Sequence, residues 1–133
     1  MRTAVRVRWT DLDAFGHVNN AVYLTYLEEG RDRLVDSTMG DTFGDFVVAH
    51  ISIDYRSAIT EADEHVFVES LLVNYGRSSF RTAERVTVDS GRLAAEAQTV
   101  LVALDRTTGS ARPLTDSEVK ALETLGPENR VQP

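Results

Sequence analysis

The start of the chain changes from a strand pattern to a helix pattern. Apolar side chains alternate with arginine at Val5, Val7 and Trp9, which predicts a short strand with these three residues on its buried face. From residue 23 the apolar positions instead follow helical spacing. This apolar stripe comprises Tyr23, Leu24, Leu27, Leu34 and Val35. It predicts a helix from about Asn20 to Met39, with Gly40 as its C-terminal stop.

Two features of this helix concern its packing. Gly30 interrupts the apolar stripe, and a glycine there predicts a close approach by another part of the backbone. Glu28 and Glu29 are expected on a solvated face. Arg31 and Arg33 are expected to form surface ion pairs, which contribute little to stability.

The remainder of the chain is mostly strand. Four apolar-patterned segments joined by turn residues are expected as strands, at 47–56, 65–75, 79–88 and 93–104. Thr115 and Glu118 form a capping-box pattern ahead of a short helix, Glu118 to Leu125. Residues 126–133 are polar and are expected to be loose. The simplest packing is a single α+β domain over residues 1–133, in which an antiparallel sheet wraps around one long central helix.

The strand at 65–75 also bears on assembly. It is apolar on both faces, with Phe67, Leu71 and Val73 on the face opposite Val66 and Val68. One helix covers only one face of a sheet, so we expect a partner subunit on the other face. The protein is therefore predicted to be a homodimer or a homotetramer.

Composition narrows the classes of function. A formal charge of −7 argues against a nucleic-acid partner, which requires a basic face. The chain has no cysteine, which excludes disulfides and thiolate metal sites, and its three scattered histidines make a poor metal site. No apolar run approaches the roughly 20 residues that span a bilayer, and no signal peptide is visible. We expect a cytoplasmic protein without a membrane partner or a metal.

The chemistry is concentrated between the first strand and the long helix. The loop Asp13-Ala14-Phe15-Gly16-His17-Val18-Asn19-Asn20 places a carboxylate just ahead of a helix whose first backbone N–H groups lack partners. A carboxylate is a nucleophile or general base, and free N–H groups stabilise a developing oxyanion. Two alternatives stay open. Asp13 and Asp11 are also common turn or capping residues, and Asn19 and Asn20 are ordinary helix caps.

The pattern Asp-x-x-Gly-His-Val-Asn-Asn-x-x-Tyr-Leu over residues 13–24, followed by Glu28-Glu29-Gly30-Arg31, resembles the hotdog-fold acyl-CoA thioesterases. The similarity lies within the 4-hydroxybenzoyl-CoA thioesterase family, nearest to its long-chain acyl-CoA branch. It extends over essentially the whole chain, including the Gly-Arg-Ser-Ser-Phe turn at residues 76–80. The resemblance implies a hotdog fold and hydrolysis of an acyl-CoA, with coenzyme A entering as part of the substrate and no other cofactor.

The resemblance also implies roles for individual residues. The catalytic carboxylate falls on Asp13, and the backbone N–H that polarises the thioester falls near Asn20. The segment that meets the nucleotide end of coenzyme A falls on Arg77 and Ser78. His17 is placed in the site without a proton-transfer role.

Three further positions, Gly16, Asn19 and Tyr23, are expected to line the substrate site. Gly16 is expected to adopt a backbone conformation that other residues resist, and Tyr23 is interpreted mainly as core or dimer packing. Because the loop has Ala14 and His17 where the aromatic-substrate subgroup has proline and bulky apolar residues, an aliphatic acyl group is favoured.

Three alternative functions remain. A hydrolase could take its acyl group from an acyl carrier protein instead of coenzyme A. The second alternative is a hotdog dehydratase or hydratase. That chemistry needs an Asp/His pair on a different motif, and His17 lies in the wrong context for it. The third alternative is a non-catalytic acyl-CoA binding module, which would not need the catalytic carboxylate of Asp13.

Overall fold

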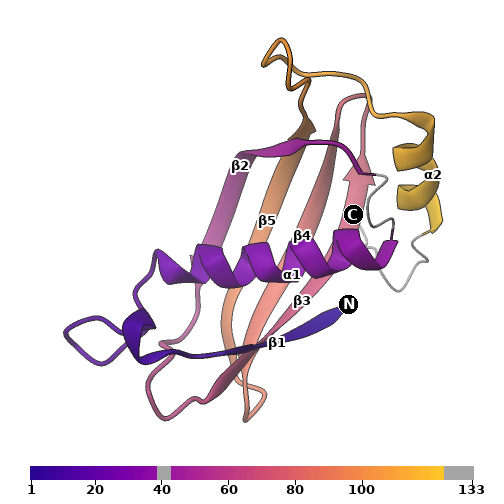
Figure 1. The fold of residues 1–133 in the computed structure, drawn as a ribbon. Coiled ribbons are helices and arrows are strands. Elements are labelled where there is room, and N and C mark those ends of the chain that lie inside the picture. Colours follow the sequence, from indigo (N-terminus) through magenta and orange to yellow (C-terminus); the bar gives the residue numbers. More distant parts are fainter. Residues whose placement is uncertain (39–42, 125–133) are drawn as a thin grey trace.

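A single long helix lies across one face of a twisted antiparallel sheet (Figure 1). The computed structural model describes residues 1–38 and 43–124. Its sheet has the strand order β1-β3-β4-β5-β2. The elements in chain order are β1 (Arg2–Arg6), a 3-10 turn (Trp9–Asp11), α1 (Val22–Thr38), β2 (Phe46–Tyr55), β3 (His65–Tyr75), β4 (Ser79–Val88), β5 (Leu93–Ala103) and α2 (Asp116–Thr124).

The predicted elements are all present, with small shifts at their ends. Helix α1 begins two residues later than expected, and the expected stop at Met39 and Gly40 lies outside the described residues, as does the tail at 126–133. The capping box ahead of α2 is confirmed. The Glu118 N–H donates to Thr115 Oγ1 at 3.1 Å and the Thr115 N–H donates to Glu118 Oε1 at 2.9 Å.

Gly30 packs tightly against strand β3. A Cβ atom on this residue would lie 2.5 Å from Val68 Cγ1 and 2.7 Å from Ser70 Oγ, both on β3. No side chain fits at Gly30 without a shift of its neighbours, but the atoms that approach it belong to β3 side chains and not to the backbone that the sequence predicted. Within residues 1–38 and 43–124, no helix is long and apolar enough to cross a bilayer.

Two apolar residues that were predicted to be buried, Trp9 and Leu24, are exposed. Strand β1 ends at Arg6, and the Asp11 carboxylate accepts the Arg8 N–H at 2.9 Å. This contact turns the chain into the short 3-10 turn. Trp9 therefore lies outside the strand and is 85% exposed. The prediction that Trp9 is on the buried face of the first strand is wrong. Leu24, assigned to the apolar stripe, is 40% exposed because it lies at the margin of the helix face that meets the sheet.

Arg31 also differs from the prediction, since it is buried and not on a solvated face. Its Nη1 lies 3.4 Å from Glu84 Oε1 on β4 and 3.4 Å from Thr99 Oγ1 on β5. It follows Gly30 directly, so the same close approach brings its side chain over the middle of the sheet. Burial raises the pKa of Glu84, while the Arg31 charge acts in the opposite direction.

The outer face of the sheet is partly covered by side chains of its own. The Arg2 guanidinium lies 4.0 Å from the centroid of the Phe67 ring. Leu71 lines a shallow hollow of about 360 Å³ together with charged residues, among them Glu69 and Arg85. This face is therefore more polar than the pattern of β3 alone indicated, and the oligomeric state stays a prediction.

Candidate active site

Asp13 lies in a tight turn that fixes its carboxylate. Its Oδ1 accepts the backbone N–H of Phe15 at 2.9 Å and that of His17 at 3.1 Å. The other oxygen, Oδ2, accepts no hydrogen bond from residues 1–38 or 43–124. Asp13 thus forms the side-chain turn that is common for aspartate. This turn leaves Oδ2 of the half-buried carboxylate available for chemistry.

The rest of this loop is a small hairpin. The Asp13 N–H donates to the His17 carbonyl at 2.7 Å, and Leu12 pairs with Val18 in an antiparallel bridge. Gly16 has a φ of +77°, the left-handed conformation expected from its sequence position. The His17 side chain is exposed. The structure therefore brings Asp13, Gly16 and His17 together in one turn.

The hairpin leads directly into the start of α1. Asn19 acts as a cap, because its Oδ1 accepts the Ala21 N–H at 2.9 Å and its carbonyl accepts the Val22 N–H at 2.9 Å. The Asn20 N–H meets no acceptor in the described part of the chain. A fixed helix start with a free donor is the geometry that an oxyanion site requires.

Asp11 has the structural role expected of it. It is buried, and its carboxylate accepts the Tyr26 hydroxyl at 2.8 Å and two side-chain nitrogens of Arg8 at 2.9 and 3.1 Å. Burial alone would raise the pKa of Asp11, but these hydrogen bonds hold it below its ordinary value. Asp11 therefore anchors the base of the hairpin. Its backbone carbonyl also accepts the Asn19 N–H at 2.9 Å.

Tyr23 lies in the core beside the helix start. It is 3% exposed, and its ring meets the Tyr55 ring edge-on with centroids 4.9 Å apart. Burial raises the pKa of the Tyr23 hydroxyl. The packing interpretation of Tyr23 thus matches its position, and a direct contact with substrate stays a prediction.

Arg77 and Ser78 lie at the other end of the sheet. The Ser78 carbonyl accepts the N–H of Ala103, and Ala103 is the sheet partner of Phe46 at the start of β2. The helix start instead contacts Tyr55 at the end of β2, nine residues along the strand from Phe46. At about 3.3 Å per residue the two sites are roughly 30 Å apart in one chain. A single chain does not bring Arg77 and Ser78 to Asp13.

Two further contributors to the site were not predicted. Tyr55 was assigned to a strand, but period-two patterning gives no information about which hydroxyl reaches a distant carbonyl. The connection between β2 and β3 meets the Asp13 hairpin through the Val18 N–H, which donates to the Ile59 carbonyl at 2.8 Å. Among the described residues no group of three or more His, Cys, Asp or Glu side chains is arranged to hold a metal ion.

Comparison with known proteins identifies the family of this chain. Residues 7–122 match the Thioesterase-like superfamily. The chain belongs to this superfamily. It is 32% identical to the long-chain acyl-CoA thioesterase FadM of Escherichia coli K12, over 94% of this chain and 98% of that protein.

Solved structures give the same result for the fold. A thioesterase from Thermus thermophilus, in complex with coenzyme A and zinc, superposes with a TM-score of 0.84 at 41% identity, covering 93% of this chain and 92% of that one. A predicted thioesterase from Bacillus stearothermophilus superposes with a TM-score of 0.86 at 23% identity, covering 99% and 97%. The predicted hotdog fold and thioesterase family are confirmed.

Proposed function

We propose that this thioesterase-superfamily member hydrolyses an acyl-CoA thioester to a free acid and coenzyme A. The observation that carries the proposal is the pairing of a fixed carboxylate, Asp13, with an unpartnered N–H, that of Asn20, at the two ends of one short hairpin. Thioester hydrolysis requires a group that attacks the carbonyl carbon and a donor that stabilises the resulting oxyanion.

Asp13 supplies the attack in either of two ways. Its carboxylate adds to the thioester carbonyl and expels the coenzyme A thiolate, and water then hydrolyses the mixed anhydride. Alternatively it removes a proton from a water molecule that attacks directly. In both routes the free oxygen Oδ2 does the chemistry, while the two N–H bonds to Oδ1 fix the direction of the carboxylate. His17, on the same turn, contacts the substrate and is given no proton-transfer role.

The acyl group is proposed to be a medium- or long-chain aliphatic one. The E. coli relative is named for long-chain acyl-CoA, and the Thermus structure carries coenzyme A. Ala14 and His17 in the loop are consistent with an aliphatic group. Gly16 and Asn19 are placed along the thioester, and Arg77 and Ser78 at the nucleotide end of coenzyme A.

The distance between Asp13 and the Arg77–Ser78 turn supports a site that is shared between two subunits. Strand β2 is at the edge of the sheet, and in the described ranges no strand pairs with its outer side. It is ten residues long with Val47 and Val48 both more than 40% exposed, and an edge of that kind normally finds a partner. Antiparallel pairing of two β2 strands about a two-fold axis brings the Phe46 end of one chain beside the Tyr55 end of the other. In that homodimer the partner's turn supplies Arg77 and Ser78 to each helix start.

The reaction is tested by release of free thiol from a panel of acyl-CoAs. We expect turnover by the wild type and a loss of at least a hundredfold in Asp13→Asn with acyl-CoA binding retained. Asp105→Asn is a matched control, since Asp105 Oδ1 also accepts two backbone N–H groups in a turn, those of Thr107 and Thr108, away from the helix start. Binding without turnover in the wild type would favour the binding module, and turnover confined to acyl carrier protein thioesters would change the substrate.

The shared site is tested by subunit mixing. Asp13→Asn and the double variant Arg77→Ala/Ser78→Ala are each expected to be weak. A mixed dimer of the two restores one intact site, because each variant supplies what the other lacks. Activity that does not rise above the mean of the two parent variants would contradict a site built from two subunits.

A further inference from the structure

The Asp13 hairpin rests on a segment that has no regular structure of its own. We name residues 57–63, between β2 and β3, the supporting segment. Val18 donates its N–H to the Ile59 carbonyl at 2.8 Å, and His17 pairs with Thr60 in an antiparallel bridge. These contacts lie directly behind the turn that fixes Asp13, so a displacement of residues 59–60 displaces the carboxylate.

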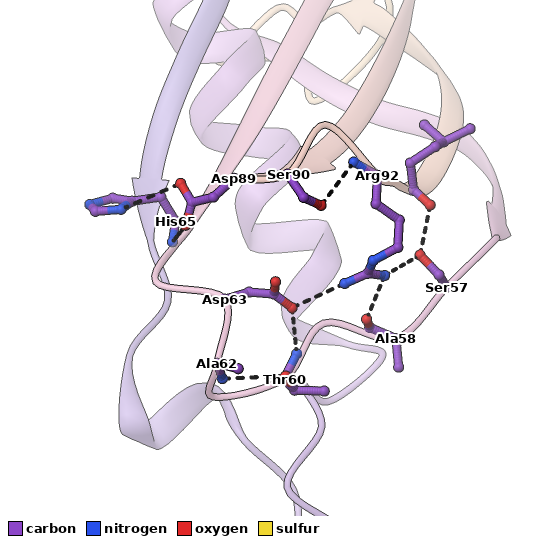
Figure 2. A network of polar contacts seen from close by, with 10 residues as sticks. Ser57, Ala58, Thr60, Ala62, Asp63, His65, Asp89, Ser90 and Arg92 are labelled. Carbon is purple, nitrogen blue, oxygen red and sulfur yellow. Dashed lines mark hydrogen bonds and ion pairs between the residues drawn. The ribbon is translucent and has the colours of Figure 1, made fainter.

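The supporting segment is in turn held by one side chain from the hairpin between β4 and β5. Figure 2 shows the Arg92 guanidinium reaching across to this segment. Its Nη1 donates to the Ala58 carbonyl at 2.9 Å and to the Ser57 hydroxyl, and its Nη2 donates to Asp63 Oδ2 at 3.2 Å. One planar group therefore ties both ends of the segment together.

Asp63 adds further contacts from within the supporting segment. We name these contacts and those of Arg92 together the brace. Asp63 Oδ2 accepts the Thr60 N–H at 3.0 Å as well as the Arg92 guanidinium, and the Asp63 N–H donates to the Thr60 carbonyl at 3.0 Å. Ile59, between these contacts, is fully buried in the core. Burial of Ile59 sets the depth of the segment, whereas Arg92 and Asp63 set the orientation of its backbone, including the carbonyl that receives Val18.

From these contacts we infer that Arg92 is a positioning residue for the Asp13 carboxylate. Arg92 forms no hydrogen bond or ion pair with Asp13, and it acts through the supporting segment and the Val18–Ile59 bond. The Arg92 side chain is 40% exposed, and ion pairs of this kind contribute little to global stability. The main effect of Arg92 is therefore on the position of the Asp13 carboxylate and not on the free energy of unfolding. This inference rests on the proposed function.

The test compares Arg92→Ala with Arg56→Ala in the full chain. Arg56 is a matched control, because it adjoins the segment in sequence but pairs with Asp54 and Glu96 on the outer face of the sheet. We expect Arg92→Ala to lower kcat by about tenfold to a hundredfold with a smaller change in KM, since misplacement of a reacting group by about 1 Å has an effect of that size. Hydrogen exchange of the Val18 amide is expected to accelerate at least tenfold. Arg56→Ala leaves both quantities unchanged.

Arg92→Lys gives a second test that does not depend on the alanine variant folding. Lysine keeps the charge beside Asp63 but lacks the fork that reaches Ser57 and Ala58 together, so kcat is expected to fall below that of the wild type and Val18 exchange to accelerate. An unchanged kcat in a folded Arg92→Ala, or a kcat loss without faster Val18 exchange, would overturn the inference. An inactive wild type would instead overturn the proposed function, while the Val18 exchange still reports on the brace.

Discussion

The Tyr55 hydroxyl donates to the backbone carbonyl of Asn20 at 3.0 Å, which joins the edge strand of the sheet to the start of α1. The carbonyl of Asn20 belongs to the same peptide group as the Ala21 N–H, and that N–H is bound by Asn19 Oδ1. Both sides of this peptide are thus fixed. The adjacent Asn20 N–H is left free and held in one direction, as a preorganised donor requires.

Tyr55→Phe is expected to lower kcat about fivefold. It removes one hydrogen bond, with a net contribution of roughly 1 kcal/mol, and leaves the ring packed on Tyr23. Steady-state kinetics should show the change mainly in kcat. Tyr75→Phe, which removes the hydroxyl that donates to Glu123 Oε1 on α2, is the control. Equal effects of the two substitutions would contradict a specific role for Tyr55.

The backbone of Asn20, and not its side chain, is expected to carry the oxyanion role. Asn20→Pro deletes the free N–H at a position ahead of α1 where proline is tolerated, and kcat should fall by about a hundredfold or more. Asn20→Ala keeps the N–H and should retain most of the activity. Circular dichroism checks that both variants keep their helix content. A larger loss in Asn20→Ala than in Asn20→Pro would assign the role to the side chain.

Removing Arg31 should destabilise the fold strongly. Arg31→Leu leaves Glu84 buried without its positive partner, and breaking a buried pair in this way costs about 3–5 kcal/mol. Urea unfolding measures the free energy of unfolding directly. The double variant Arg31→Leu/Glu84→Leu removes both charges and is expected to recover much of the loss. A change below about 1 kcal/mol in the single variant would show that the pair is not buried in solution.

Glu118 is expected to make the fold acid-sensitive. Burial alone would raise its pKa, but hydrogen bonds from Arg112 and from the N–H groups of Thr115 and Gly44 lower it to about 2. Because the folded pKa lies below the ordinary value of 4.5, this carboxylate stabilises the fold above about pH 4.5, and the stabilisation is lost as the pH falls toward 2.

This pH dependence is measured as the difference in unfolding free energy between wild type and Glu118→Gln. The difference is expected to shrink by about 2 kcal/mol between pH 7 and pH 3. Comparing variants is necessary because Glu84, whose pKa is raised by burial, contributes with the opposite sign. Glu123→Gln removes an exposed carboxylate from the same helix and serves as the control. A difference that stays constant with pH would contradict the role of Glu118.

Features that depend on residues close together in the chain were predictable from the sequence. Apolar spacing gave α1 and the four long strands, since helices and strands bury one face at their own period. The Thr115–Glu118 capping box and the turn at Gly16 were predictable because their hydrogen bonds join residues a few positions apart. The Asp13 turn and the Asn19 cap are equally local, so the core of the candidate site was readable as a motif.

Contacts between residues far apart in the chain were not predictable, because they depend on how the elements pack. Arg31 and Glu84 are 53 positions apart, and their pairing depends on where α1 crosses the sheet. The same holds for Tyr55 with Asn20 and for Arg92 with the 57–63 segment, where the register of β2 and β5 sets the contact. An isolated arginine on a helix pattern looks solvated whether or not a carboxylate lies beneath it. Periodicity records which face of an element is buried, and only packing determines what that face touches.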